Sequence, residues 1–193
     1  MIGVAIKTAF SIVALSAMAM PVCAQLPRTL ISAAPLAGAP SGSSAYRIRY
    51  YTTNLNGRRR EVTGAVIVPD GPAAAEGRNI VAWAHGTSGI AESCAPSDSP
   101  DLYRSIAGLS DILQRGYVVV AADYEGLGST GPHPYLVGES AARAVIDAVR
   151  ATRQLPIAAS TGRYAVWGES QGGQTALATG QIAARYADRK SVV

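Results

Sequence analysis

Three short, uninterrupted apolar runs constrain the fold of this sequence most strongly. They occupy residues 80–84, 117–122 and 164–167. Strands with one solvated face alternate apolar and polar residues, so runs without alternation are typical of strands buried on both faces. Segments with helical spacing lie between and after these runs. The sequence therefore predicts an α/β fold with a mostly parallel sheet covered by helices.

The segment before these runs has the signature of an antiparallel hairpin. Apolar and polar residues alternate over residues 46–50 and again over residues 62–68, and Asn56-Gly57 between them is a tight-turn signal. We therefore expect an antiparallel hairpin at the N-terminal edge of the sheet. Residues 25–44 are rich in Pro, Ala, Gly and Ser and are interpreted as an extended lead-in, which leaves residues 45–193 as the globular part.

Helical spacing predicts three helices. The first begins after Ser99, which is the expected N-cap, continues to about Gln114 and ends at Gly116. The second covers about 138–155, and the third follows Ser170. The apolar stripe of the second helix is Val137, Ala141, Val145, Ala148, Val149 and Thr152, and its outward residues are Arg143, Asp147, Arg150 and Arg153. The apolar members of the third are Ala176, Leu177, Ile182 and Ala183.

The first 24 residues have the pattern of a cleaved signal peptide. Lys7 supplies the early positive charge, an apolar run covers residues 9–20, and small residues lead to a cleavage site after Ala24. The run is shorter than the roughly 20 residues that a transmembrane helix needs. An uncleaved anchor and a lipoprotein modified at Cys23 are the alternatives. We expect the protein to be secreted or periplasmic.

Charge and composition exclude several classes of function. The net charge of +4 falls short of a nucleic-acid-binding signature, so no nucleic-acid partner is expected. The two cysteines and two histidines of the chain leave little for a metal centre. We expect no metal and no cofactor. The run Arg58-Arg59-Arg60 after the hairpin turn is interpreted as a solvated face, with contact to an anionic surface as the alternative.

The motif Gly168-Glu169-Ser170-Gln171-Gly172 directly follows the third apolar run and precedes a helix. A nucleophile elbow needs this strand, turn and helix order, with glycines two positions either side of a strained serine. Ser170 is therefore the predicted nucleophile, and the Gln171 N–H is a predicted oxyanion donor. Gly168 and Gly172 provide the space, and Gly173 adds clearance. The alternative is a glycine-rich turn with a capping serine.

Two further segments follow predicted parallel strands at the edge where active sites form. His85-Gly86-Thr87 lies after the first strand, where a loop N–H, here that of Thr87, is the second oxyanion donor in many serine hydrolases. A base that precedes the serine breaks the expected chain order, so His85 is assigned a structural role. Asp123 and Glu125 follow the second strand, and the residues alone leave open whether they are functional or a polar loop.

Three segments resemble the secretory lipase family, the lipase A-like branch of the α/β-hydrolases. They are residues 92–97 with the motif C-A-P-S, residues 116–126 with the motif D-x-E-G, and residues 168–173. The resemblance implies an α/β-hydrolase fold, Ser170 as nucleophile, and Asp123 with Gln171 in the oxyanion hole. It implies hydrolysis of carboxylic esters or lipids, transient contact with a lipid interface, a helical cap after the elbow, and no cofactor.

The catalytic triad departs from this pattern. In this architecture the acid and the histidine follow the serine, but after Ser170 there is one aspartate, Asp188, and no histidine. We therefore expect an N-terminal part of a larger hydrolase, inactive alone, that lacks the triad acid and histidine, the last strands and the cap. The resemblance places the disulfide partner of Cys94 in the missing part. A prolyl-oligopeptidase-type peptidase and a non-catalytic hydrolase-like binding protein are the alternatives.

Overall fold

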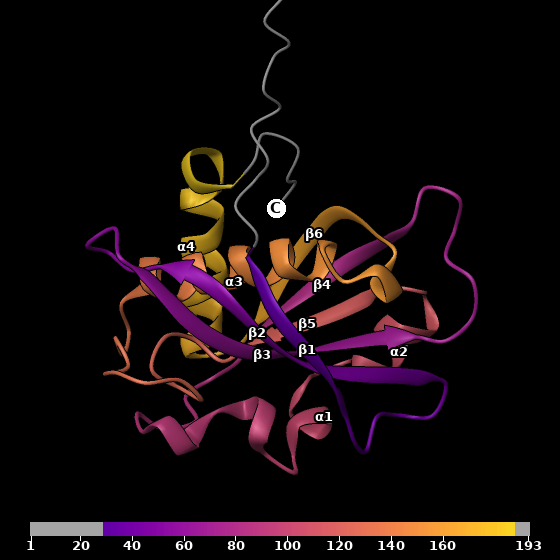
Figure 1. The fold of residues 1–193 in the computed structure, drawn as a ribbon, viewed down its shortest axis with the longest axis horizontal. Helices are drawn as coiled ribbons and strands as arrows, with labels where there is room; N and C mark the ends of the chain where they lie inside the picture. The colour runs from indigo at the N-terminus through magenta and orange to yellow at the C-terminus, as the bar shows by residue number, and fades with distance from the viewer. Residues whose placement is uncertain (1–28, 188–193) are drawn as a thin grey trace, which may run out of the picture.

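A computed structural model describes residues 29–187 (Figure 1). The predicted signal peptide and Asp188 lie outside the described residues. Six strands form one sheet in the order β1-β2-β3-β5-β4-β6. The strands are β1 (Leu30–Leu36), β2 (Ser43–Thr53), β3 (Arg59–Pro69), β4 (Arg78–Ala84), β5 (Val118–Ala122) and β6 (Ser160–Gly168). The three apolar runs and the hairpin are thus confirmed as strands.

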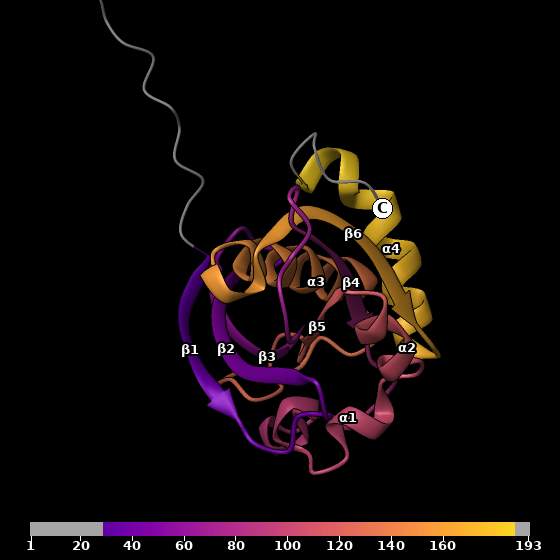
Figure 2. The same cartoon turned by 90° about the vertical axis from the view of Figure 1, so that its right-hand side faces the viewer.

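The sheet is mixed, so the prediction of a mostly parallel sheet was wrong. β4 pairs in parallel with β5 and with β6. The pairs β1–β2, β2–β3 and β3–β5 are antiparallel. The lead-in contributes β1, an edge strand that was not expected because its residues do not alternate between apolar and polar, and most of them are exposed. In Figure 2 the strands β1 to β3 curl around one side of the molecule.

Helices cover both faces of the sheet. One face carries α3 (Gly138–Arg153), which packs in turn against α4 (Gln171–Tyr186) through Ile146 and Ile182. The opposite face carries α1 (Leu102–Ser105) and α2 (Leu109–Gln114), whose leucines pack on the sheet (Figures 1 and 2). Three short 3₁₀ turns complete the elements, η1 (Glu92–Cys94), η2 (Pro96–Asp98) and η3 (Pro156–Ala158).

The predicted helix to Gln114 is two helices. The chain breaks between α1 and α2, where Gly108 takes the left-handed conformation at φ 73°. Ser99 is not the N-cap of α1. Asp101 occupies that position, and its N–H donates to Ser99 Oγ at 3.1 Å in the preceding turn. α3 ends at Arg153, two residues before the predicted end.

The outward faces of α3 and α4 also differ from the pattern. Asp147 on α3 was expected to face water but is 3% exposed, because Arg150 and the Tyr186 hydroxyl pair with it. Leu177 on α4 was expected to be in the core but is 74% exposed. The core side of α4 consists instead of small and polar residues, including Thr175 and Thr179, with Ile182 at its end.

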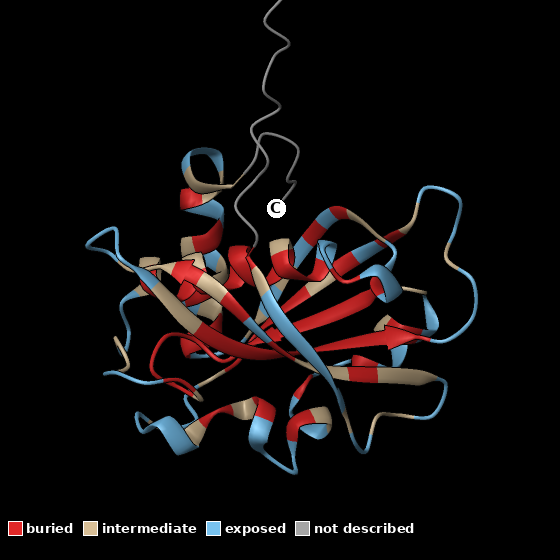
Figure 3. Cartoon of the chain, viewed as in Figure 1, coloured by how far each residue is buried: buried red, intermediate tan, exposed pale blue. Residues whose placement is uncertain are grey.

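The core divides into two clusters on the two faces of the sheet. One joins the central strands to α3, and the other joins them to α1 and α2. Figure 3 shows the buried central strands and the exposed outer surfaces of β1 and α4. Among residues 29–187, no helix has both the length and the apolar character needed to cross a membrane.

Candidate active site

Ser170 lies in the sharp turn between β6 and α4. Its backbone has φ 52° and ψ −122°, and it is the N-cap of α4. Strain of this kind costs about 1–3 kcal/mol and concentrates at functional sites. A Cβ at Gly168 would lie 2.4 Å from the Ala84 oxygen, and one at Gly172 would lie 1.9 Å from it. Only glycine therefore fits at these two positions, whereas a Cβ at Gly173 would make ordinary contacts.

The first turn of α4 presents a free backbone donor beside Ser170. The Gly172 N–H donates to the Glu169 oxygen at 2.7 Å, and the Gln174 N–H donates to the Ser170 oxygen at 3.1 Å. Gln171 is the first helical residue, so its N–H has no acceptor within the helix. This N–H is positioned at the positive end of the helix dipole, where an anion is stabilised.

The Gln171 side chain is buried and joins two other loops. Thr87 Oγ1 donates to Gln171 Oε1 at 3.2 Å, and Tyr135 OH lies 3.2 Å from Thr87 Oγ1. On the other side, Gln171 Nε2 lies 3.2 Å from His133 Nε2. His133 Nδ1 lies 2.8 Å from the Glu125 backbone oxygen. The structure therefore brings the Thr87 and Gln171 side chains into contact and adds His133 and Tyr135, which sequence reasoning missed; the role of the two backbone N–H groups as oxyanion donors stays a prediction.

His85 is held inside the loop after β4. The residue is 5% exposed, and its ring stacks on Tyr124 with the ring centroids 4.0 Å apart and places Nδ1 2.6 Å from the Gly86 oxygen. The Tyr124 hydroxyl donates back to the His85 oxygen at 2.9 Å. Burial lowers the pKa of His85 to about 4, so the imidazole is neutral near pH 7. These contacts favour the structural role over proton transfer.

Asp123 of the D-x-E-G motif is hydrogen-bonded to Ser97 of the C-A-P-S motif. Its fully buried carboxylate accepts hydrogen bonds from the Thr63 hydroxyl at 2.7 Å, the Ser97 N–H at 2.8 Å and the Ser97 hydroxyl. Burial raises the pKa of Asp123, and these hydrogen bonds oppose the rise. Both oxygens are thus engaged by β3 and η2. The pairing of Asp123 with Gln171 in an oxyanion hole stays a prediction.

Glu125 anchors the loop that carries His133. Its carboxylate pairs with Arg60 Nε at 2.9 Å and accepts from the Ser140 hydroxyl at 3.2 Å. Arg60 also donates to the Thr130 oxygen at 2.8 Å. The solvated-face interpretation of the arginine run was therefore wrong for Arg60, because a nearly buried carboxylate lies within its reach.

A cleft of about 560 Å³ adjoins the elbow. Glu169 and Thr87 line it from the elbow side, and Trp83, Cys94 and Asp98 line it elsewhere. The Cys94 thiol is partly buried and forms no disulfide within the described residues. In the same part of the chain, no three His, Cys, Asp or Glu side chains gather into a group that could hold a metal ion.

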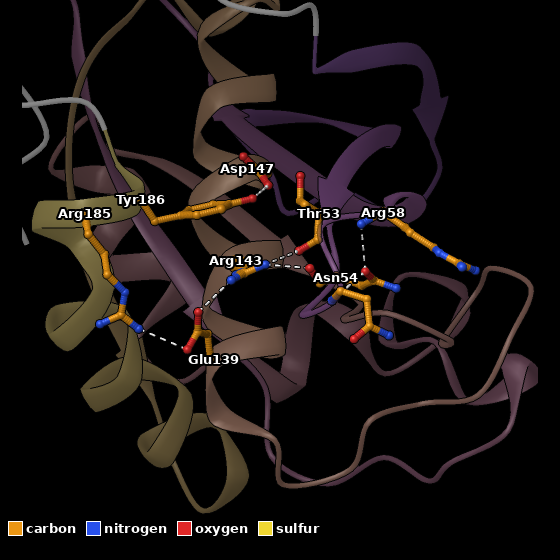
Figure 4. Close-up of polar contacts among 9 residues, drawn as sticks. Thr53, Asn54, Arg58, Glu139, Arg143, Asp147, Arg185 and Tyr186 are labelled. Atoms are coloured by element: carbon orange, nitrogen blue, oxygen red, sulfur yellow. Dashed lines mark hydrogen bonds and ion pairs between the residues drawn. The ribbon is translucent and has the colours of Figure 1, made fainter.

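A polar network holds α4 against α3 and the end of β2 (Figure 4). Glu139 accepts from Arg143 at 2.7 Å and from Arg185 at 3.0 Å. Arg143 also donates to the Thr53 oxygen at 3.3 Å. The Tyr186 hydroxyl donates to the buried Asp147 at 2.6 Å. Since α4 begins at the elbow, this network fixes the helix that positions Ser170.

Comparison with known proteins finds a family match that includes the elbow. Residues 103–193, which include the elbow, match the secretory lipase family. The predicted resemblance to the secretory lipases is thereby confirmed. Among curated proteins, Lipase A of Moesziomyces aphidis is 25% identical over 167 residues, which is 81% of this chain and 35% of that protein.

Solved structures agree with the secretory lipase match. The rice cell wall degrading esterase LipA from Xanthomonas oryzae superposes with a TM-score of 0.70 at 26% identity, over 84% of this chain and 47% of that one. Candida antarctica lipase A in its closed state gives 0.68 at 23% identity, over 82% of this chain and 39% of that one, and supports the fold. The described residues thus share the fold of part of these α/β-hydrolases, and the chain spans half or less of the length of these relatives.

Proposed function

We propose that this chain is the nucleophile-bearing part of a secreted carboxylic-ester hydrolase, a lipase or esterase of lipid degradation, that works through an acyl-serine intermediate. The observation that carries the proposal is the conformation of Ser170, held at φ 52° between β6 and α4 by two glycines that no other residue can replace. Relatives named as lipases and an esterase supply the reaction class.

In the proposed reaction, Ser170 Oγ attacks the ester carbonyl carbon while a histidine removes the hydroxyl proton. The Gln171 N–H and a second donor, the Thr87 N–H, stabilise the negative charge on the carbonyl oxygen. Asp123, the other expected member of the oxyanion hole, is fully buried with its carboxylate and its N–H already bonded, so its proposed part is to hold the loop beside the hole. The C–O bond then breaks, and the histidine returns the proton to the leaving alcohol. Water attacks the acyl-serine in the same way and releases the acid.

We propose that residues outside this sequence supply the histidine and its acid. Among the described residues, no side chain is hydrogen-bonded to Ser170 Oγ. Both ring nitrogens of His133 are bonded elsewhere, and His85 is buried with its Nδ1 on the Gly86 oxygen and its Nε2 without a partner in the described part of the chain. The proposal includes a disulfide partner for Cys94 in that additional part, and transient contact with a lipid interface. We expect the 193-residue chain alone to show no robust hydrolysis that depends on Ser170.

The test uses the gene product with the coding sequence that follows Val193. We expect it to hydrolyse p-nitrophenyl butyrate and to be labelled by a fluorophosphonate probe, and Ser170→Ala to abolish both. Hydrolysis that survives Ser170→Ala would refute the assignment of the nucleophile. Cleavage of a proline-containing peptide without ester hydrolysis would indicate a peptidase, and absence of probe labelling would indicate a binding protein.

A further inference from the structure

We infer that His133 is a positioning residue for the oxyanion hole and acts through the side chain of Gln171; this inference rests on the proposed function. His133 does not lie in the elbow motif, and it precedes the serine in the chain. Its Nε2 lies 3.2 Å from Gln171 Nε2, and Gln171 carries a proposed oxyanion donor on its backbone. The contact joins residues 38 apart in sequence.

The hydrogen bonds around Gln171 fix which atom donates at each contact. A backbone carbonyl oxygen only accepts, so His133 Nδ1 carries a proton and donates to the Glu125 oxygen at 2.8 Å. In the neutral ring Nε2 is then the unprotonated acceptor, and it faces the Gln171 amide nitrogen, which only donates. Thr87 gives its single hydroxyl proton to Gln171 Oε1, so Tyr135 OH donates to Thr87. Each of these hydrogen bonds therefore has a defined donor and a defined acceptor.

These donor and acceptor assignments matter because the Gln171 side chain joins the two segments that carry the proposed oxyanion donors. Its Oε1 is bonded to Thr87, whose backbone N–H is the second candidate donor. If the amide rotated by half a turn, its NH₂ group would face the Thr87 hydroxyl and its oxygen would face the lone pair of His133 Nε2. The acceptor on His133 prevents this rotation and so maintains the spacing of the two donors. Oxyanion stabilisation depends on donors that are fixed before reaction.

His133 is itself rigidly held, as a positioning residue must be. Its ring is parallel to Tyr124 within 8° at 6.2 Å, and its Nδ1 is bonded to the backbone of Glu125. The Glu125 carboxylate is fixed by Arg60 on β3 and Ser140 on α3. The orientation of Gln171 is therefore set by the sheet and by α3, outside the elbow.

Nuclear magnetic resonance on the 193-residue chain tests which atom donates and which accepts in these hydrogen bonds, and the measurement does not need an active enzyme. The sequence has only two histidines, so the imidazole ¹⁵N signals are few and His133→Gln assigns them. At pH 8 we expect the Nδ1–H tautomer for His133, with Nε2 as the unprotonated nitrogen. An Nε2–H tautomer would overturn the inference, because that nitrogen could not accept from Gln171.

Two substitutions test the positioning role. His133→Phe keeps a ring against Tyr124 but removes the acceptor, whereas His133→Gln places an amide oxygen close to the position of Nε2. In the complete gene product we expect His133→Phe to lower kcat for p-nitrophenyl butyrate by about tenfold to a hundredfold with little change in KM. We expect His133→Gln to restore most of the loss. In the 193-residue chain, the amide signals of Thr87 and Gln171 should shift in the Phe variant and return in the Gln variant.

The outcomes separate this inference from the proposed function. Equal kcat in the wild type and His133→Phe, or equal loss in both variants, would overturn the positioning role. If His133→Phe does not fold, Gln171→Glu replaces it: the carboxylate has no proton to donate to His133 Nε2, so the ¹⁵N signal of that nitrogen should change. An unchanged ¹⁵N signal would count against the contact. A wild type that is inactive on esters but has the Nδ1–H tautomer would refute the proposed ester hydrolase function, while the donor and acceptor assignment around Gln171 would stand.

Discussion

Acidification should destabilise the fold through His85. The residue is 5% exposed, its ring is stacked on Tyr124, and its Nδ1 donates to the Gly86 oxygen. Burial disfavours the charged imidazolium and lowers the pKa to about 4 from an ordinary value of 6.5. In the unfolded chain the same ring takes up a proton near pH 6.5. Between these two values only the unfolded state is protonated.

The sign and size of the effect follow from this difference. Where the unfolded state binds one more proton, the free energy of unfolding rises with pH by about 1.4 kcal/mol per unit. The contribution of His85 is therefore complete above pH 6.5 and is lost as the pH falls toward 4, by a total of about 3 kcal/mol. Asp123 and Asp147, whose pKa values are raised by burial, act in the opposite direction.

Urea unfolding of the 193-residue chain between pH 4 and pH 8 measures the effect against His85→Asn. Asparagine keeps an N–H close to the position of Nδ1 and cannot titrate, so the contributions of the aspartates cancel in the comparison. We expect the stability of the wild type relative to the variant to fall by about 3 kcal/mol as the pH decreases from 7 to 4. A difference that is independent of pH would refute the burial of a neutral His85.

Three further substitutions test the elbow and the packing around it, all by urea unfolding at pH 7. Gly172→Ala should lower the free energy of unfolding by more than about 3 kcal/mol, because its Cβ would lie 1.9 Å from the Ala84 oxygen. The control Gly173→Ala should lower it little, and equal losses in the two variants would contradict the elbow geometry. Asp123→Asn should cost about 1–3 kcal/mol, because its NH₂ group would face donors, and no loss would argue against that cluster. Tyr186→Phe should cost about 1–2 kcal/mol by removing the donor to buried Asp147, and an unchanged midpoint would exclude this contact as an anchor of α4.

The central strands could be predicted because burial on both faces leaves a pattern in the sequence itself. β4 and β5 are apolar throughout their middle, and their short length and their valines favour a strand over a buried helix. β1 could not be predicted in this way, because it pairs with β2 through its backbone while its side chains remain exposed. The break before α2 depends on the left-handed Gly108, and a glycine in a helical pattern does not reveal its φ.

The candidate site likewise contains residues that a local sequence pattern predicts and residues that only the folded structure brings together. Ser170, Gly168 and Gly172 lie within five residues of one another, so their spacing alone predicts the elbow. The contacts of Gln171 join residues 38 and 84 apart in sequence, and no local pattern encodes them. Burial of Asp147 was likewise invisible, because helical periodicity counts a carboxylate as outward unless its partners on another helix are known.

The C-A-P-S and D-x-E-G motifs have a physical explanation in the Asp123 cluster. Three donors from Ser97 and Thr63 converge on one buried carboxylate, and a buried carboxylate is tolerated only when its oxygens are satisfied in this way. The cluster fixes η2 against β3 and the end of β5, and the contacts of Gln171 with Thr87 and His133 join the elbow to two further loops. Because a charge-stabilising site must be rigid before the charge forms, these residues contribute to catalysis, if the proposed function holds, without touching the reacting atoms.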